Sequence, residues 1–261
     1  FDMNEEYITH EYDVVIIGAG GAGLRAAIEA SKTGVSVAMI CKSMLGKAHT
    51  VMAEGGAAAA LGNKDPRDNW QTHFRDTMKG GKYLNDWRMA RIHAQQAPDR
   101  IRELETWGAI FDRTSKGLTN QRNFGGHTYP RLAHIGDATG LELIRTLQEK
   151  GVHMGMDVFM EFTVRKLFTT NGIISGCFAY DRNDGTLHVF KSKTIVDLDL
   201  RASGIKKGKR SFLRCEITLF LKELKHKDIK VPCISESVTD ITNEIINKTL
   251  LTSQTFKFHK S

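Results

Sequence analysis

The chain has 261 residues, a formal net charge of +7, 41% hydrophobic residues and four cysteines. No apolar run reaches the roughly 18–20 residues of a membrane span. The cysteines are scattered without a C-x-x-C pair, which argues against an iron–sulfur or zinc site and indicates a reducing compartment. Residues 201–261 carry 13 Lys/Arg and 6 Asp/Glu, whereas residues 1–200 carry 24 of each sign. The excess charge is therefore confined to the C-terminal segment and does not indicate nucleic-acid binding.

The N-terminal part of the chain predicts a dinucleotide-binding unit. Residues 1–11 are interpreted as a polar lead that is not a signal peptide, and the start at Phe1 indicates a cut or processed end. Asp13–Ile17 is predicted as a buried parallel strand, and a helix is predicted from Gly21 to about Thr33. In the turn between them, Gly18 should permit the sharp bend and Gly23 should let the helix pack close on the strand, so that a pyrophosphate is held on free backbone N–H groups. The expected contact residues are Gly18, Ala19, Gly20, Gly21, Ala22 and Gly23.

The second strand is predicted over Val35–Ile40, after a helix end at Gly34 that favours a positive φ. Cys41, Lys42 and Ser43 follow it, where nicotinamide-dependent folds usually place an acid, so an NAD-dependent dehydrogenase is disfavoured. A loop rich in small residues comes next, and its backbone could approach a flat cofactor. It contains His49, which on its own would more often be a structural residue than a functional one.

Helices are predicted over about Arg67–Met78, over Asn85–Trp107 with an interruption or a kink near Pro98, and over Ala138–Lys150 with Asp137 as N-cap. In the second of these, a buried stripe is expected at Trp87, Ala94, Ile101, Leu104 and Trp107. His127, His134 and Asp137 have no supporting ligand pattern, so we expect structural roles for them and no metal site.

From residue 157 onward the pattern predicts strands. Phe159–Phe168 forms one or two, Ile173–Tyr180 and Leu187–Phe190 follow, and Asn171-Gly172 and Asp184-Gly185 mark the hairpin turns between them. These strands should form an antiparallel meander. Lys193–Val196 is expected to be a separate strand that returns to the parallel sheet.

Three segments in order carry a family resemblance: GAGGAGLR from Gly18, AHTVMAEGG from Ala48 and NFGG from Asn123. In order and spacing they resemble the flavoprotein subunit of succinate dehydrogenase and fumarate reductase, in its bacterial form and in its N-terminal portion only. The fold implied is α/β, a glutathione-reductase-like FAD-binding Rossmann domain with an antiparallel β-meander, incomplete at the C-terminus. This FAD-binding domain would cover residues 12–196.

The resemblance implies that FAD is bound covalently through the ring nitrogen of His49, and neutral imidazole is a competent nucleophile near pH 7. The cofactor contacts expected besides the glycine turn are Cys41, Lys42, Ser43, Ala48, Thr50, Glu54, Gly55 and Gly56. Phe124 and Gly125 would line the dicarboxylate site. No catalytic residue is expected in this chain, because the family's proton-donating arginine belongs to a part without a counterpart here.

By the same resemblance, the intact protein would interconvert succinate and fumarate and pass electrons through an iron–sulfur subunit to quinone. Its partners would be the iron–sulfur and membrane anchor subunits of the family complex, with no nucleic acid and no direct membrane insertion. It would lie on the inner face of the cell membrane, or on the matrix side in a mitochondrion.

The resemblance stops after Val196, and residues 197–261 look like an unrelated basic tail. A truncated or frameshifted gene product, a fused segment and true divergence all remain open for it. Two other functions also remain open. One is a catalytically silent fragment that at most binds FAD, and the other is an aspartate-oxidase-like flavin oxidoreductase with non-covalent FAD.

Overall fold

The computed structural model describes residues 7–197 and 218–221, and the chain divides into two compact units. The described part of unit 1 consists of residues 7–45, 156–197 and 218–221, and unit 2 consists of residues 46–155. The predicted FAD-binding segment 12–196 contributes to both units. The remaining residues of the predicted basic tail lie outside the described part.

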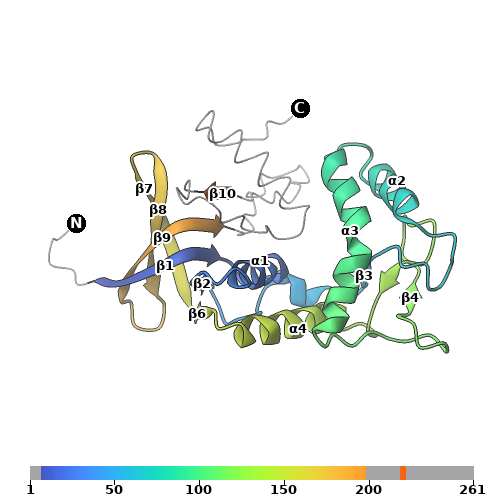
Figure 1. Ribbon diagram of the computed structural model, residues 1–261, viewed down its shortest axis with the longest axis horizontal. Helices are drawn as coiled ribbons and strands as arrows, with labels where there is room; N and C mark the ends of the chain where they lie inside the picture. Colours follow the sequence, from blue (N-terminus) through green and yellow to red (C-terminus); the bar gives the residue numbers. More distant parts are fainter. Residues whose placement is uncertain (1–6, 198–217, 222–261) are drawn as a thin grey trace, which may run out of the picture. The chain divides into compact units, whose positions relative to one another are not determined.

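Unit 1 is built on a seven-stranded mixed sheet (Figure 1). The first four strands in spatial order are mutually parallel, and the next two return antiparallel as a meander. In that order they are β6 (Asp157–Phe159), β2 (Val37–Ile40), β1 (Tyr7–Ile17), β9 (Leu187–Asp197), β8 (Ile173–Asp181) and β7 (Phe162–Thr170). The expected α/β architecture with an antiparallel meander is therefore present.

The apolar runs of β1 and β2 form the core of the parallel half. Val15 and Ile16 are fully buried, as are Ala38 and Met39 on the neighbouring strand. Helix α1 (Gly21–Ser31) follows β1 directly and packs on these two strands. Gly34 has a φ of +77°, as predicted for the residue that ends this helical segment.

The meander is bounded by the turns that the sequence predicted. Asn171 and Gly172 have φ values of 54° and 76°, as a two-residue hairpin with primed geometry requires. Phe162, Cys177 and Phe190 from the three successive strands are buried in one core cluster. Phe159–Phe168, which was expected to form one or two strands, contributes to two, β6 and β7.

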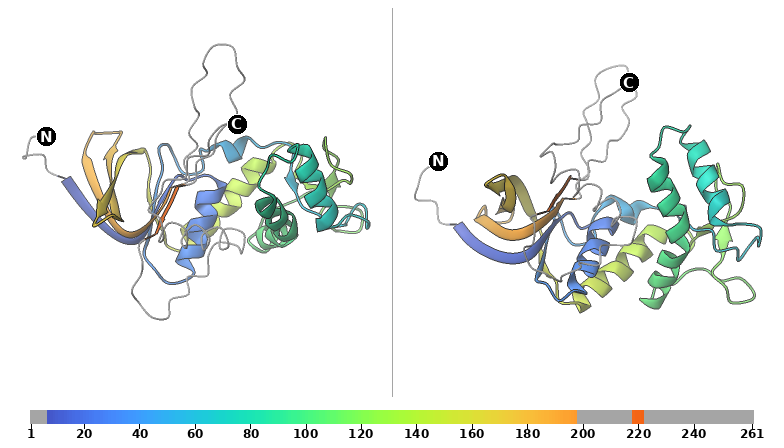
Figure 2. Two further views of the ribbon diagram at one scale, coloured as in Figure 1. Left: turned by 90° about the horizontal axis from the view of Figure 1, so that it is seen from above. Right: turned by 45° about the horizontal axis from the view of Figure 1, so that its top comes forward.

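The prediction of a short first strand and of two separate strands near residue 190 was wrong. β1 starts at Tyr7, inside the predicted lead, and β9 is one strand that pairs with β1 from Leu187 to Asp197 (Figure 2). Lys191 and Lys193, just before and at the start of the second predicted segment, lie on exposed positions. Lys191 Nζ lies 3.1 Å from Glu11 and Lys193 forms an ion pair with Asp13, so opposite charges meet across the two strands.

The edge of β9 that faces away from β1 is shared by two strands. Its first half pairs with β8, and residues 194–197 pair antiparallel with β10 (Thr218–Leu221). This short strand comes from the segment predicted to be an unrelated tail. Among the residues that the structure describes, no helix is both long enough and apolar enough to cross a membrane.

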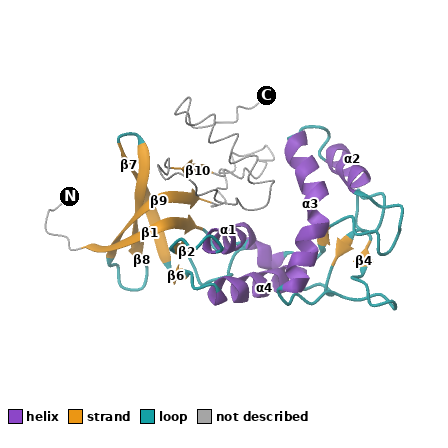
Figure 3. Ribbon diagram, in the orientation of Figure 1, coloured by secondary structure: helices purple, strands orange, loops and turns teal. Residues whose placement is uncertain are grey.

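Unit 2 is mainly helical (Figure 3). Asn69 and Asp86 accept hydrogen bonds from the first-turn amides of α2 and α3, so each helix has a side-chain N-cap. In chain order its elements are the 3₁₀ turn η1 (His49–Met52), β3 (Ala57–Ala58), α2 (Trp70–Gly80), α3 (Trp87–Thr106), β4 (Gln121–Arg122), β5 (Leu132–Ala133) and α4 (Thr139–His153).

Two expectations for the helices of unit 2 were wrong. Trp87 is 50% exposed, so it does not belong to the buried stripe, whereas Ala94 and Ile101 do. It stands at the first position of α3, where Arg88 and Arg91 lie over its ring. Asp137 does not cap α4, because Ala138 holds that position without a side-chain hydrogen bond. Helix α3 continues through Pro98.

A buried ion cluster ties the segment before β5 to α2. The side chain of Arg131 is fully buried and donates to both carboxylate oxygens of Asp68, at 3.1 and 2.8 Å. Its third nitrogen lies 3.0 Å from Asp76. A buried guanidinium needs such partners because its desolvation is costly. The cluster therefore fixes where the chain enters β5.

Candidate functional site

The glycine turn of unit 1 has the geometry predicted for it. Gly18 has a φ of +104°, which side-chain-bearing residues rarely adopt, and its N–H donates to Ile40 O at 2.9 Å. The turn is thus tied to the end of β2. Gly20 is the N-cap of α1 in an extended conformation, and it makes no side-chain cap bond.

Gly23 is required by close packing between α1 and the turn. A Cβ at this position would overlap the carbonyl oxygen of Gly18 and approach its carbonyl carbon. The first turn of α1 holds no acidic residue. An anion placed at this N-terminus would therefore meet the positive end of the helix dipole without a competing carboxylate.

The three residues after β2, Cys41, Lys42 and Ser43, differ in burial and in their hydrogen bonds. Cys41 is buried and donates its N–H to Phe159 O at 2.9 Å, and burial raises the pKa of its thiol to about 11. Lys42 is exposed, and its carbonyl oxygen accepts a hydrogen bond from Arg182. Ser43 accepts a backbone hydrogen bond from Glu161. Lys42 is therefore the most exposed of the three, and Ser43 is half-buried.

In unit 2, His49 opens the 3₁₀ turn η1 and its side chain is exposed. The turn rests on the N-terminus of α4, because Gly140 donates its N–H to Ala53 O at 2.7 Å. A Cβ on Gly140 would overlap the carbonyl oxygen of Thr50. This glycine therefore permits the close approach that seats the histidine turn on the helix.

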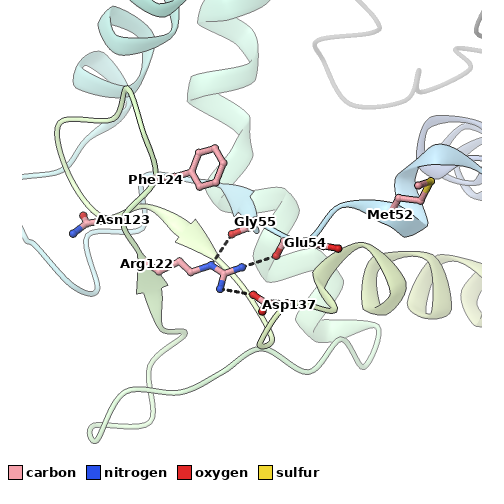
Figure 4. Close-up of a pocket in the computed structure, with 7 residues that line it drawn as sticks. All are labelled: Met52, Glu54, Gly55, Arg122, Asn123, Phe124 and Asp137. Carbon is pink, nitrogen blue, oxygen red and sulfur yellow. Dashed lines mark hydrogen bonds and ion pairs between the residues drawn. The ribbon is translucent and has the colours of Figure 1, made fainter.

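A pocket lies beside this turn, entirely within unit 2 (Figure 4). It brings together two stretches that the sequence singled out separately, the Glu54–Gly55 loop and the Asn123–Phe124 segment. The ring of Phe124 is 58% exposed and lies 3.2 Å from the point where a Cβ on Gly55 would stand. Gly56 has a φ of +118°, which side-chain-bearing residues rarely adopt, so this loop needs a glycine at that position.

Arg122 is the residue of this pocket that the sequence analysis missed. Its Nε donates to Gly55 O at 2.7 Å and its Nη2 to Glu54 O at 2.5 Å. Its Nη1 contacts Asp137 at 3.0 Å. The only sequence signal was its place directly before the Asn123-Phe-Gly-Gly motif, which says nothing about a partner 67 positions away.

The predicted site residues thus form two groups. Residues 18–23 and 41–43 gather at the β1–α1 turn and the end of β2 in unit 1. In unit 2, Glu54, Gly55 and Phe124 line the pocket, whereas Ala48, His49, Thr50 and Gly56 are their neighbours in the chain or in the loop and do not line it. Gly125 follows Phe124 in an exposed turn and does not line the pocket. No group of three or more metal-binding side chains occurs within residues 7–197 and 218–221.

Comparison with known proteins gives one family. The sequence profile of the family described as "FAD binding domain" matches residues 13–218. The match extends past Val196, so the domain boundary predicted there stays a prediction.

Two curated relatives illustrate the similarity. The chain is 45% identical over 188 residues to one chain of the fumarate reductase (CoM/CoB) of Methanothermobacter marburgensis, covering 72% of this chain and 34% of the relative. It is 38% identical over 204 residues to the succinate dehydrogenase flavoprotein subunit of Rickettsia bellii, covering 74% and 34%. The chain thus spans about a third of the length of these relatives.

Solved structures agree in fold. The Sdh1 structure of Mycobacterium smegmatis in complex with UQ1 matches with a TM-score of 0.71 and 55% identity, covering 74% of this chain and 34% of that one. A quinol fumarate reductase of E. coli matches with a TM-score of 0.69 and 33% identity, covering 72% and 32%.

Proposed function

The chain belongs to the FAD binding domain family, and from this premise we propose that it is the FAD-binding portion of a flavoprotein that interconverts succinate and fumarate. The relatives named above carry this activity in their names. We further infer a glutathione-reductase-like topology. The parallel order β6–β2–β1–β9 with an antiparallel excursion through β7 and β8 supports it.

The observation that carries the proposal is the glycine turn in unit 1. Gly18 needs its positive φ, Gly23 cannot accept a Cβ, and α1 begins without a side-chain cap or an acid in its first turn. These features fit the diphosphate of FAD, which needs close backbone approach and a positive helix end. Lys42 and Ser43, at the end of β2, would contact the nucleotide portion.

The residues of unit 2 would hold the isoalloxazine end. The exposed ring of His49 would carry the covalent bond, and the backbone from Ala48 to Gly56 would lie against the flavin. Phe124 would line the dicarboxylate site. FAD would supply hydride acceptance from succinate. The electrons would leave through the iron–sulfur and membrane anchor subunits, on the inner face of the membrane.

The experiment that tests the proposal compares the wild-type chain with His49→Ala, both produced in the presence of FAD. The wild type should retain flavin after acid denaturation, and its mass should rise by one flavin. His49→Ala should lose the acid-stable flavin and keep dissociable FAD, because the diphosphate cradle lies elsewhere in the chain.

His153→Ala is the matched control, since His153 is an exposed histidine at the end of α4. It should carry as much covalent flavin as the wild type. Dissociable flavin in the wild type, unaffected by His49→Ala, would refute covalent attachment and favour the aspartate-oxidase-like alternative. A wild type that binds no flavin at all would refute the proposal itself.

A further inference from the structure

The guanidinium of Arg122 forms hydrogen bonds with the protein's own backbone. Two of its three nitrogens donate to the successive carbonyl oxygens of Glu54 and Gly55, at 2.5 and 2.7 Å. Charge-assisted hydrogen bonds of this kind are among the stronger ones in proteins. Figure 4 shows the guanidinium between this loop and Asp137. An arginine engaged in this way is not free to receive a substrate carboxylate.

The two carbonyl contacts determine the orientation of the two peptide groups that join Glu54 to Gly55 and Gly55 to Gly56. No peptide bond of the described chain is cis, so each carbonyl oxygen lies opposite the N–H of its own planar peptide group. With the Glu54 and Gly55 carbonyls directed at the guanidinium, the N–H groups of Gly55 and Gly56 face the other way. Two adjacent N–H groups facing one side can receive an electron-rich atom.

We propose that Arg122 is a positioning residue that holds residues 54–56 in the orientation in which the Gly55 and Gly56 N–H groups face away from the guanidinium. Its fork grips two carbonyls at once, which a single ammonium cannot do in the same geometry. The grip itself is independent of any ligand. Its consequence for the flavin rests on the function proposed above.

The first test uses cleavage by a glutamate-specific protease at the Glu54–Gly55 bond in the 261-residue chain without added FAD. Cleavage requires local release of the loop, in which Glu54 is exposed, Gly55 and Gly56 are half-buried and Arg122 holds two carbonyls. Arg122→Gln should accelerate this one cleavage by about tenfold or more. A hydrogen bond to a charged group stabilises the closed loop by more than the free energy that corresponds to a tenfold change in the opening equilibrium. Fragment masses identify the bond that is cut.

Two further variants make the test specific. Arg102→Gln removes the same charge from an exposed site on α3, where the Arg102 guanidinium pairs with Asp99, and should leave the cleavage rate unchanged. Arg122→Lys keeps the charge without the fork and should be cleaved nearly as fast as Arg122→Gln. If Arg122→Gln unfolds and is cut at every glutamate, the cleavage rate of Arg122→Lys decides whether the arginine fork holds the loop.

Wild-type cleavage rates in Arg122→Gln, or full rescue by Arg122→Lys, would overturn the proposal. A second readout links it to the cofactor: with FAD present, Arg122→Lys should form covalent flavin several-fold more slowly than the wild type at a temperature at which both remain folded. If the wild type takes up no flavin, the proposed function fails, and the protease assay still decides the role of Arg122.

Discussion

At the scale of single residues, the two units depend on glycines and buried charges whose roles come from their neighbours. Gly23 and Gly140 each face a backbone carbonyl too close for a Cβ. Arg131 is fully buried between two aspartates. The first of these glycines was predicted from its motif. Gly140 and Arg131 were not, because their partners lie far away in the sequence.

Gly23→Ala should destabilise unit 1 and weaken FAD binding together. The new Cβ overlaps Gly18 O, so α1 must move away from the turn, at a cost of roughly 1–3 kcal/mol. Urea unfolding and FAD titration measure the two effects. Gly80→Ala is the control, because its Cβ would meet nothing within 4 Å, and it should be neutral or slightly stabilising. Equal behaviour of the two variants would contradict the packing argument.

His73 should make unit 2 sensitive to acid. It is 1% exposed, and burial, followed by the electrostatic effects of nearby His93 and Arg131, lowers its pKa to about 3. The unfolded chain takes up this proton near pH 6.5, so stability is lost as the pH falls from about 6.5 toward 3.

The measurement for His73 is urea unfolding at pH 7 and pH 5. His73→Gln should lose less stability than the wild type between these two values, because it has no proton to bind. His127→Gln provides a comparison, since the pKa of His127 is also lowered, chiefly by burial. An identical pH dependence in the wild type and His73→Gln would rule out this role.

At the scale of elements, β1 and β9 form the longest pairing of the described part, 10 matched positions. The alternation Glu11-x-Asp13 against Lys191-x-Lys193 was visible in the sequence, but only the register shows that the four side chains face one another. Because this pairing begins at Tyr7, β1 starts earlier than the predicted strand Asp13–Ile17.

Reversing one charge of this ladder tests the register. Lys191→Glu should destabilise unit 1 by about 0.5–1 kcal/mol, because it places two carboxylates opposite each other on an exposed face. Adding Glu11→Lys should restore most of the loss. Urea unfolding at low and high salt measures both, and high salt should shrink the effect. A double variant no better than the single one would argue against this pairing.

At the scale of the whole molecule, the chain spans about a third of its curated relatives. We therefore expect negligible succinate-dependent dye reduction by the 261-residue chain, even when flavin is bound. The assay is reduction of an artificial acceptor by the flavin-loaded chain, with a full-length flavoprotein of the family run in parallel. Succinate-dependent turnover by the short chain would show that it already contains the proton-transfer residues.

The sequence by itself determined the strand–glycine turn–helix unit and the hairpin turns of the meander, whose glycines have the positive φ values expected. It also determined the family, and the comparisons confirm that family. These features rest on local rules: a buried apolar strand, glycines at positive φ and turn dipeptides at close spacing. Which histidine carries FAD stays a prediction. The roles of Arg122, Arg131 and Gly140 were decided only by the tertiary structure. Each acts on a segment more than 50 residues away, and no local pattern encodes such a pairing.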